Sequence, residues 1–235
     1  MPSACAQPNT SPASTTPNAT TTIPGAPIAT TATASGSEPV TVTTDVLRLT
    51  LDGGRVRSAE LLRYPVDAKS GEAGNIQLFD PTPAHYFEAQ SGCVSNNAPA
   101  PNHETGFVPE GNARAYTMAA DAKSIAVPFT WTGPNGVTIR RTYTLDRGSY
   151  AIVVHDEVIN NGTAPWQGFV YRQLIRNPPP QKSGYTNPEA LAFHGAAWYS
   201  PQDKYERRKY ADFVGDGPLN KEVNGGWIAL LQHYF

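Results

Sequence analysis

The chain has little cysteine and no long apolar run. It holds 2 cysteines in 235 residues, Cys5 in a Thr/Ala/Pro-rich segment and Cys93 in a Ser/Gly/Asn-rich one. A disulfide between them would join a disordered arm to a loop and stabilise little, so we expect both thiols to be free or incidental. No stretch of about 18 consecutive apolar residues occurs, which argues against a transmembrane helix in this sequence. The N-terminus also lacks the basic and then apolar pattern of a signal peptide.

The chain also has no large excess of basic or acidic residues. The formal net charge is −2, and without a basic excess we expect no nucleic-acid partner. The sequence shows no metal-ligand cluster, no phosphate-binding loop and no convincing catalytic triad. We therefore predict no metal, no cofactor and no enzymatic activity.

The first 39 residues differ in composition from the rest of the chain. They contain 9 Thr, 8 Ala, 7 Pro and 5 Ser, their only charged side chain is Glu38, and they have no aromatic residue. Such a segment cannot bury enough apolar surface to offset the entropy of ordering it. We predict a disordered tether over residues 1–39 and one folded domain over residues 40–235.

The folded part shows the alternating pattern of β-strands. Residues 41–51 and 55–64 alternate around Asp52-Gly53-Gly54, which predicts a hairpin. The segments 136–145, 150–158 and 166–175 alternate with short turns between them, which predicts an antiparallel meander. Short strands are predicted at 76–79 and 85–89, a further strand at 190–199, and a long loop at 91–113. Recurring strands with turns, and no long helical period, indicate an all-β sandwich of antiparallel sheets.

The last ten residues are ambiguous. Trp227, Leu230, Leu231 and Tyr234 are spaced i, i+3, i+4 and i+7, as on an amphipathic helix. The same residues would also suit a buried strand. A short C-terminal helix and a strand both remain open for residues 226–235.

Several segments stand out by their order and spacing: Val42–Leu51, the Gly53-Gly54 turn, Leu61–Pro65, Arg141–Tyr150, Gly195-Ala-Ala-Trp-Tyr-Ser-Pro201, Lys204-Tyr-Glu206 and Gly225-Gly-Trp227. Together, in this order, they resemble the periplasmic domain of the YidC family of bacterial membrane protein insertases. The resemblance covers about Val40 to Phe235, and no single motif carries it alone.

The resemblance implies a galactose-mutarotase-like β-supersandwich on the periplasmic side of a Gram-negative inner membrane. It implies as partners nascent membrane proteins, the Sec translocon and its SecDF accessory, and the inner membrane through flanking helices. In that family insertion belongs to transmembrane helices absent here, so this piece would be a non-catalytic scaffold. We accordingly expect the native protein to continue in both directions.

Two groups of residues are candidate binding surfaces. The resemblance places the segment 226–235 next to a transmembrane helix, and its aromatic residues suit a membrane interface. The membrane-proximal candidates are Trp227, Leu230, Leu231, Tyr234 and Phe235. Aromatic residues that could line a groove are Trp166, Phe169, Tyr171, Trp198 and Tyr199. For both groups the alternative is that the side chains only fill the core.

An enzyme-like alternative comes from the sugar epimerases that share the implied fold. They use a His and a Glu as acid and base, and His155 with Glu157 or His194 with Glu189 could serve in that way. His155 and Glu157 could also contribute to a metal site, although no third ligand is evident. A carbohydrate-binding or aldose-epimerase-like module is therefore the alternative function, and an exposed edge strand is a second route to partner binding.

Overall fold

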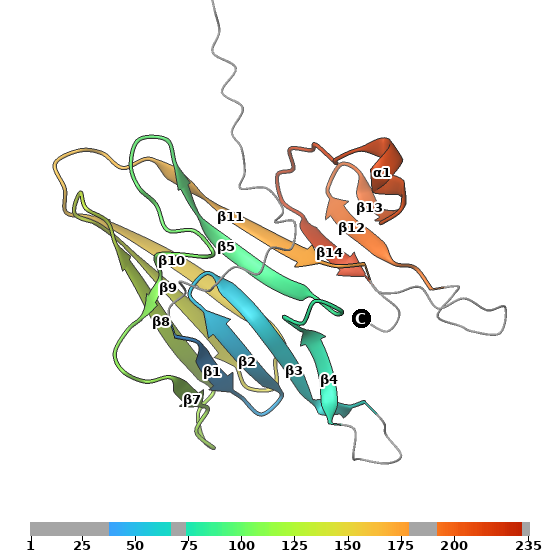
Figure 1. The fold of residues 1–235 in the computed structure, drawn as a ribbon, viewed down its shortest axis with the longest axis horizontal. Helices are drawn as coiled ribbons and strands as arrows, with labels where there is room; N and C mark the ends of the chain where they lie inside the picture. Colours follow the sequence, from blue (N-terminus) through green and yellow to red (C-terminus); the bar gives the residue numbers. More distant parts are fainter. Residues whose placement is uncertain (1–37, 67–73, 179–191, 232–235) are drawn as a thin grey trace, which may run out of the picture. The chain divides into compact units, whose positions relative to one another are not determined.

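The computed structural model describes residues 38–66, 74–178 and 192–231, and the regular secondary structure in these ranges is almost entirely strand (Figure 1). The strands are β1 Val40–Thr43, β2 Leu47–Asp52, β3 Arg55–Pro65, β4 Asn75–Phe79, β5 Phe87–Ser95, β6 Val108–Pro109, β7 Ala115–Thr117, β8 Ser124–Thr132, β9 Val137–Asp146, β10 Ile152–Asn160, β11 Gly168–Arg176, β12 Gly195–Ser200, β13 Lys204–Lys209 and β14 Trp227–Leu231. One short helix, α1, spans Asp212–Asp216. Within the described ranges no helix has the length and apolar character needed to cross a membrane.

The strands form three sheets. The first has the order β11-β5-β3-β2-β1-β7 with β4 also paired to β3, the second β10-β9-β8-β6, and the third β13-β12-β14. Pairing is antiparallel except between β1 and β7, which run parallel. These sheets confirm the predicted all-β class. Residues 1–37 of the predicted tether lie outside the described residues, so the tether stays a prediction.

The first and second sheets enclose one hydrophobic core. Alternate residues of β2 (Leu47, Leu49, Leu51) face alternate residues of β9 (Ile139, Tyr143, Leu145) within a single buried cluster. Each such side chain contributes about 1.5–3 kcal/mol when it leaves water. Because a strand has a side-chain period of two, only one face of each sheet is apolar enough to enter the core. The predicted sandwich is confirmed.

The segment expected as one strand over residues 41–51 is two strands. β1 and β2 are separated by Thr44-Asp45-Val46 and pair antiparallel with each other. The Thr44 hydroxyl accepts hydrogen bonds from the backbone N–H groups of Val46 and Leu47, at 3.2 and 3.0 Å. These hydrogen bonds stabilise a turn that reverses the chain, at a place where the alternating pattern alone predicted one continuous strand.

The hairpin at Gly53-Gly54 is confirmed, with Asp52 opposite Arg55 across the turn. Gly53 has a φ of 55°, which a side-chain-bearing residue rarely adopts. A Cβ atom at Gly53 would also lie 2.9 Å from the Phe107 carbonyl oxygen. The turn therefore packs closely against the segment that leads to β6.

The predicted three-strand meander is wrong in its last step. β9 and β10 form the expected hairpin, but β11 pairs with β5 of the first sheet instead of β10. The alternating pattern did not predict strand β8, which pairs with the other edge of β9. After Asn160 the chain crosses from the second sheet to the first. The turn residues there are compatible both with a hairpin and with this crossing.

The predicted loop over residues 91–113 is shorter than expected, because β5 continues to Ser95 and β6 occupies Val108–Pro109. The remaining loop is anchored on β11. The Tyr171 hydroxyl accepts a hydrogen bond from the His103 backbone N–H at 2.9 Å and lies 2.7 Å from His103 Nδ1. Gly92 lies under this contact, and a Cβ there would lie 2.6 Å from the Tyr171 hydroxyl.

The C-terminal ambiguity is resolved as a strand. Residues 227–231 form β14, which pairs antiparallel with β12, so the helical alternative is wrong for these residues. Residues 232–235 lie outside the described residues. The expected strand at 190–199 is β12, Gly195–Ser200, while β13 and α1 carried no clear periodic signal.

A buried ion pair connects the strands at the centre of the sandwich. Arg141 of β9 has no exposed side chain and binds Asp156 of β10 through two hydrogen bonds of 2.6 and 3.1 Å. Its Nη1 also donates to the carbonyl and the hydroxyl oxygen of Ser91 in β5. Arg172 of β11 reaches the same Asp156 carboxylate at 3.3 Å. The Phe107 ring lies 4.2 Å from the Arg141 guanidinium carbon and covers it.

Replacing Asp156 by asparagine is expected to destabilise the fold by about 3–5 kcal/mol, because Arg141 would keep its charge in a dry environment without a counter-ion. Urea unfolding measures this. The matched control is Glu110→Gln, which breaks the equally bidentate but exposed pair of the neighbouring Arg140 and should cost less than about 1 kcal/mol. Equal losses of unfolding free energy in the two variants would contradict the expectation that burial makes the Arg141–Asp156 pair more important than an exposed pair.

The His103 contact predicts a pH dependence. Burial lowers the pKa of His103 from 6.5, while Glu104 and Glu88 act to raise it and Arg55 to lower it. The folded state therefore binds fewer protons than the unfolded state, so the stability from this group is present above pH about 6.5 and is lost as the pH falls toward the folded pKa. The loss should not exceed about 1.4 kcal/mol per pH unit.

Urea unfolding of the native chain and of His103→Asn, compared above and below that pH, tests the assignment. The variant should lose this part of the pH dependence, because the asparagine amide does not titrate. An unchanged pH profile in the variant would assign the dependence to other groups.

Candidate functional site

The binding residues predicted from the sequence lie in two places. Five of them are in the third sheet: Trp198, Tyr199, Trp227, Leu230 and Leu231. Three lie on β11 or just before it, in the region of the first sheet: Trp166, Phe169 and Tyr171. Tyr234 and Phe235 lie outside the described residues. The structure therefore does not bring the five groove candidates into one groove.

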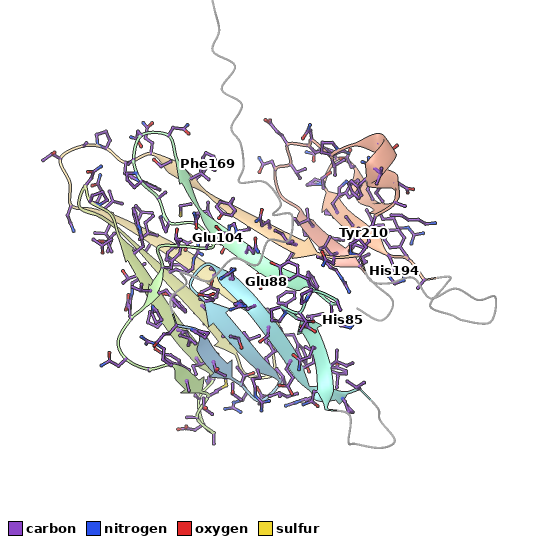
Figure 2. The ribbon with its side chains drawn as sticks, in the orientation of Figure 1. His85, Glu88, Glu104, Phe169, His194 and Tyr210 are labelled. Carbon is purple, nitrogen blue, oxygen red and sulfur yellow. The ribbon has the colours of Figure 1, made fainter. Side chains whose placement is uncertain are left out.

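The β11 group is engaged mostly in packing. Trp166 packs against the core, and its Nε1 donates to the Pro99 carbonyl at 3.4 Å. Tyr171 is half-buried and anchors the His103 loop. Phe169 is the exposed member, with 51% of its surface accessible (Figure 2).

The third sheet gathers three aromatic side chains on one face. Tyr199 on the central strand lies opposite Tyr205 of β13 and opposite Trp227 of β14. The Tyr199 and Trp227 rings stack with centroids 6.2 Å apart and an interplanar angle of 15°. The ring centroids of Tyr205 and Trp227 are 6.1 Å apart. Tyr205 and Trp227 remain about half exposed. We call these three residues the aromatic cluster.

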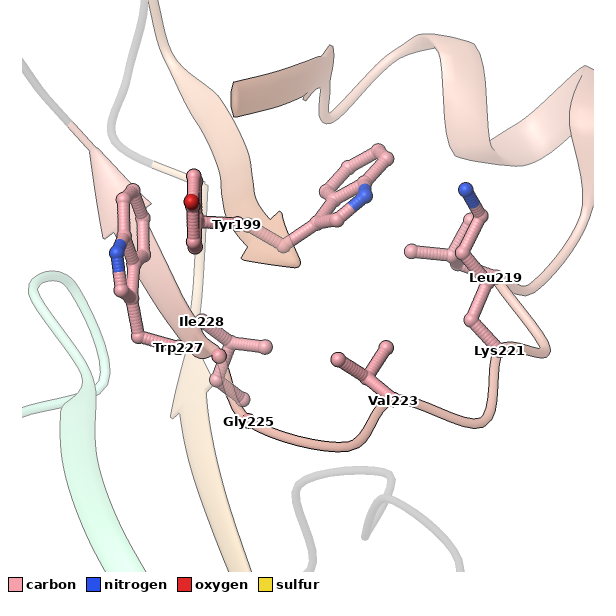
Figure 3. A pocket seen from close by; sticks show the side chains of 9 residues that line it. Tyr199, Leu219, Lys221, Val223, Gly225, Trp227 and Ile228 are labelled. Atoms are coloured by element: carbon pink, nitrogen blue, oxygen red, sulfur yellow. The ribbon is translucent and has the colours of Figure 1, made fainter. Parts of the chain in front are cut away.

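A pocket of about 500 Å³ lies at the same end of the third sheet. Figure 3 shows Leu219, Val223 and Ile228 around one open space, with Lys221 at its margin. Trp198, Tyr199, Gly225, Gly226 and Trp227 complete the lining. An apolar pocket with few polar groups is the usual form of a binding site.

Lys221 supplies the charged group of this pocket. Trp198 is 8% exposed and its buried Nε1 has no hydrogen-bond partner among the described residues, although a buried indole N–H normally finds one. The Lys221 ammonium lies 6.0 Å from the Trp198 ring centroid and 2.5 Å from the Asp203 carboxylate. Its hydrogen bond lowers the pKa of Asp203. The pocket thus offers one ammonium donor beside apolar walls.

The sequence signalled only part of this pocket. Trp198, Tyr199 and Trp227 were recognised as aromatic residues of interest. Leu219, Lys221 and Val223 were not, because they lie in an irregular segment between α1 and β14 without any periodic pattern. Proximity to β12 is a tertiary property of that segment.

A buried carboxylate on β5 was also missed. Glu88 is 2% exposed and accepts hydrogen bonds from the Tyr86 hydroxyl and from Gln90 Nε2, at 3.1 and 3.3 Å (Figure 2). Arg57 Nε lies 3.6 Å from the same carboxylate. Burial and the nearby Glu88 raise the pKa of Tyr86 to about 12. The group is a paired structural carboxylate.

The acid/base and metal candidates are dispersed. His155 and Glu157 lie on the exposed side of β10, opposite Thr142 and Arg140 of β9. His194 lies just before β12 (Figure 2), and Glu189 is outside the described residues. In the described part of the chain no three His, Cys, Asp or Glu side chains come together as a metal site. Cys93 is buried and free, and burial raises the pKa of its thiol.

Comparison with known proteins gives consistent matches to one family. The family model described as "YidC periplasmic domain" matches residues 39–235. A protein of Xanthomonas axonopodis pv. citri (strain 306) named "Membrane protein insertase YidC" is 49% identical over 218 residues, which cover 90% of this chain and 38% of that protein. Proteins of the same name from Xanthomonas campestris pv. campestris (strain 8004) and Xylella fastidiosa (strain M12) are 46% and 47% identical, over 100% and 83% of this chain.

The chain spans about two fifths of the length of these relatives, 38% of the first and 40% of the second. The matched residues run from just before β1 through β14 and include both packed sheets and the third sheet with its pocket. The chain therefore belongs to the YidC periplasmic domain family.

Proposed function

We propose that this chain is the periplasmic part of a membrane protein insertase that inserts and folds inner-membrane proteins. The observation that carries the proposal is the match of residues 39–235 to the periplasmic domain family, with nearly half of the residues identical to proteins named as insertases. None of the relatives reported above is named as a carbohydrate-binding protein or an epimerase. The insertase role is therefore preferred to the carbohydrate alternative.

The chain's own contribution is proposed to be non-catalytic. His155 and Glu157 lie on an exposed strand face, where solvent screens any acid/base pair they form. Glu88 is held by Tyr86 and Gln90 instead of facing a cavity. These arrangements support a scaffold that binds other molecules.

The pocket in the third sheet is the proposed binding surface for the apolar part of a partner. Leu219, Val223 and Ile228 offer an apolar wall, and the Lys221 ammonium suits a backbone carbonyl. A newly made membrane protein, the Sec translocon and its SecDF accessory are the proposed partners. Trp227, Leu230 and Leu231, with Tyr234 and Phe235 beyond the described residues, are proposed to lie nearest the membrane.

Full-length protein carrying this domain should restore growth and membrane insertion in cells depleted of their own insertase. Changing Val223→Asp should slow insertion of a test membrane protein severalfold, because a carboxylate would replace apolar lining in the pocket. Protease accessibility of the test protein measures insertion. The control is Val153→Asp, which adds the same charge at an exposed position on β10.

Failure of the native full-length protein to rescue would contradict the insertase role. Equal rescue by native protein and Val223→Asp would instead remove the pocket from the binding surface. A photo-crosslinker at Leu219 separates the partners further, since it should capture the test protein or a translocon subunit.

The purified chain should not accelerate mutarotation of galactose above the buffer rate, because no acid and base converge on a common cavity among the described residues. Polarimetry measures this. Turnover that His155→Ala or His194→Ala abolishes would establish an epimerase-like activity and overturn the non-catalytic proposal.

A further inference from the structure

The third sheet has two chemically different faces. The face that bears the aromatic cluster consists of alternate residues in register, namely Gly195, Ala197, Tyr199, Tyr205, Arg207, Lys209, Trp227, Ala229 and Leu231. Three are aromatic, two are cationic and none is a carboxylate. We call this surface the aromatic-basic face.

The acidic residue of β13 lies on the opposite face. Glu206 is opposite Trp198, and Arg208, which shares that face, lies 3.8 Å from Asp216 of α1 and over the Phe213 ring. The cations of the aromatic-basic face have no such partner, because no carboxylate among the described residues pairs with Arg207 or Lys209.

The exposed groups on this face combine apolar bodies with polar tips. Tyr205 is 51% and Trp227 48% exposed. Arg207 lies over the Phe193 ring at 4.8 Å, so its guanidinium is held near an apolar surface. Tyr and Trp concentrate at membrane–water interfaces, and cations beside them are attracted to negatively charged lipid headgroups.

We propose that the aromatic-basic face docks on the headgroups of anionic phospholipids. The aromatic cluster would enter the interfacial layer while Arg207 and Lys209 contact phosphate groups. Anionic headgroups are the ligand that fits this face by charge, because the face has cations without carboxylates in a chain whose overall charge is negative. The proposal rests on the proposed function, because a periplasmic insertase domain is held beside a lipid surface.

Two faces of one sheet would then serve two ligands. A protein segment would contact the pocket beside Trp198 and Ile228, while the Tyr199 and Trp227 rings, which border the same pocket, meet the membrane. This arrangement follows from the register, because neighbouring residues on β12 point to opposite sides.

The test is sedimentation of the 235-residue chain with vesicles of phosphatidylethanolamine and phosphatidylglycerol, and with vesicles of phosphatidylcholine alone. The chain should bind the anionic vesicles, and added salt should weaken that binding because it screens exposed charges. The double variant Arg207→Gln/Lys209→Gln should lower the partition coefficient about 30-fold. The matched control, Arg48→Gln/Lys123→Gln, removes two exposed cations elsewhere and should have little effect.

Three results would overturn the inference: no binding to anionic vesicles, equal binding to both vesicle types, or equal losses in the test and control variants. Circular dichroism verifies that each variant is folded. Lys209→Glu and Tyr205→Ser give a second route if Arg207 proves necessary for folding, and the salt series of the native chain needs no variant. If the native chain does not bind vesicles but the native full-length protein rescues the cells fully, only this inference is overturned. If the native chain binds vesicles but the full-length protein does not rescue, the insertase role is overturned.

Discussion

The buried charge of Arg141 is the constraint on which the sandwich depends. A guanidinium without solvent access must keep its acceptors, because leaving it unpaired costs several kcal/mol. Those acceptors are Asp156 on β10 and Ser91 on β5, and Asp156 in turn binds Arg172 on β11. One charge therefore joins both sheets. The contact of Arg172 with the same carboxylate also links β11 of the first sheet to β10 of the second.

The third sheet shows how a small element can present two surfaces. Its central strand places Trp198 and Tyr199 on opposite faces; both line the pocket, and Tyr199 also forms the aromatic cluster with Tyr205 and Trp227. Buried Ala197 and Gly195 keep the middle of the sheet thin, and a Cβ at Gly195 would collide with the Arg208 carbonyl. On β12 the large side chains, Trp198 and Tyr199, therefore lie toward the end of the strand where the pocket is.

The parts of the fold that depend on neighbouring residues were predictable. Alternation identified β2, β3, β9 and β10, and the glycines after Asp52 indicated the first hairpin. The break at Thr44 was not recognised, because its cause is one side-chain hydroxyl bonding to the backbone ahead of it. The partner of β11 could not be inferred either, since a strand's own sequence does not state which of two sheet edges it will join. For the candidate site, Trp198, Tyr199 and Trp227 were identified in advance, but Lys221 and Val223 were not.

The sequence by itself determined the all-β class, most strand positions and the family to which the chain belongs, because side-chain alternation, turn residues and ordered motifs are local properties. Only the tertiary structure decided which aromatic residues act together. Trp166 and Tyr171 pack against loops of the sandwich, whereas Tyr199, Tyr205 and Trp227 meet across three strands. Cross-strand neighbours come from segments far apart in the chain, so their meeting depends on sheet register, which is set by packing of the whole domain.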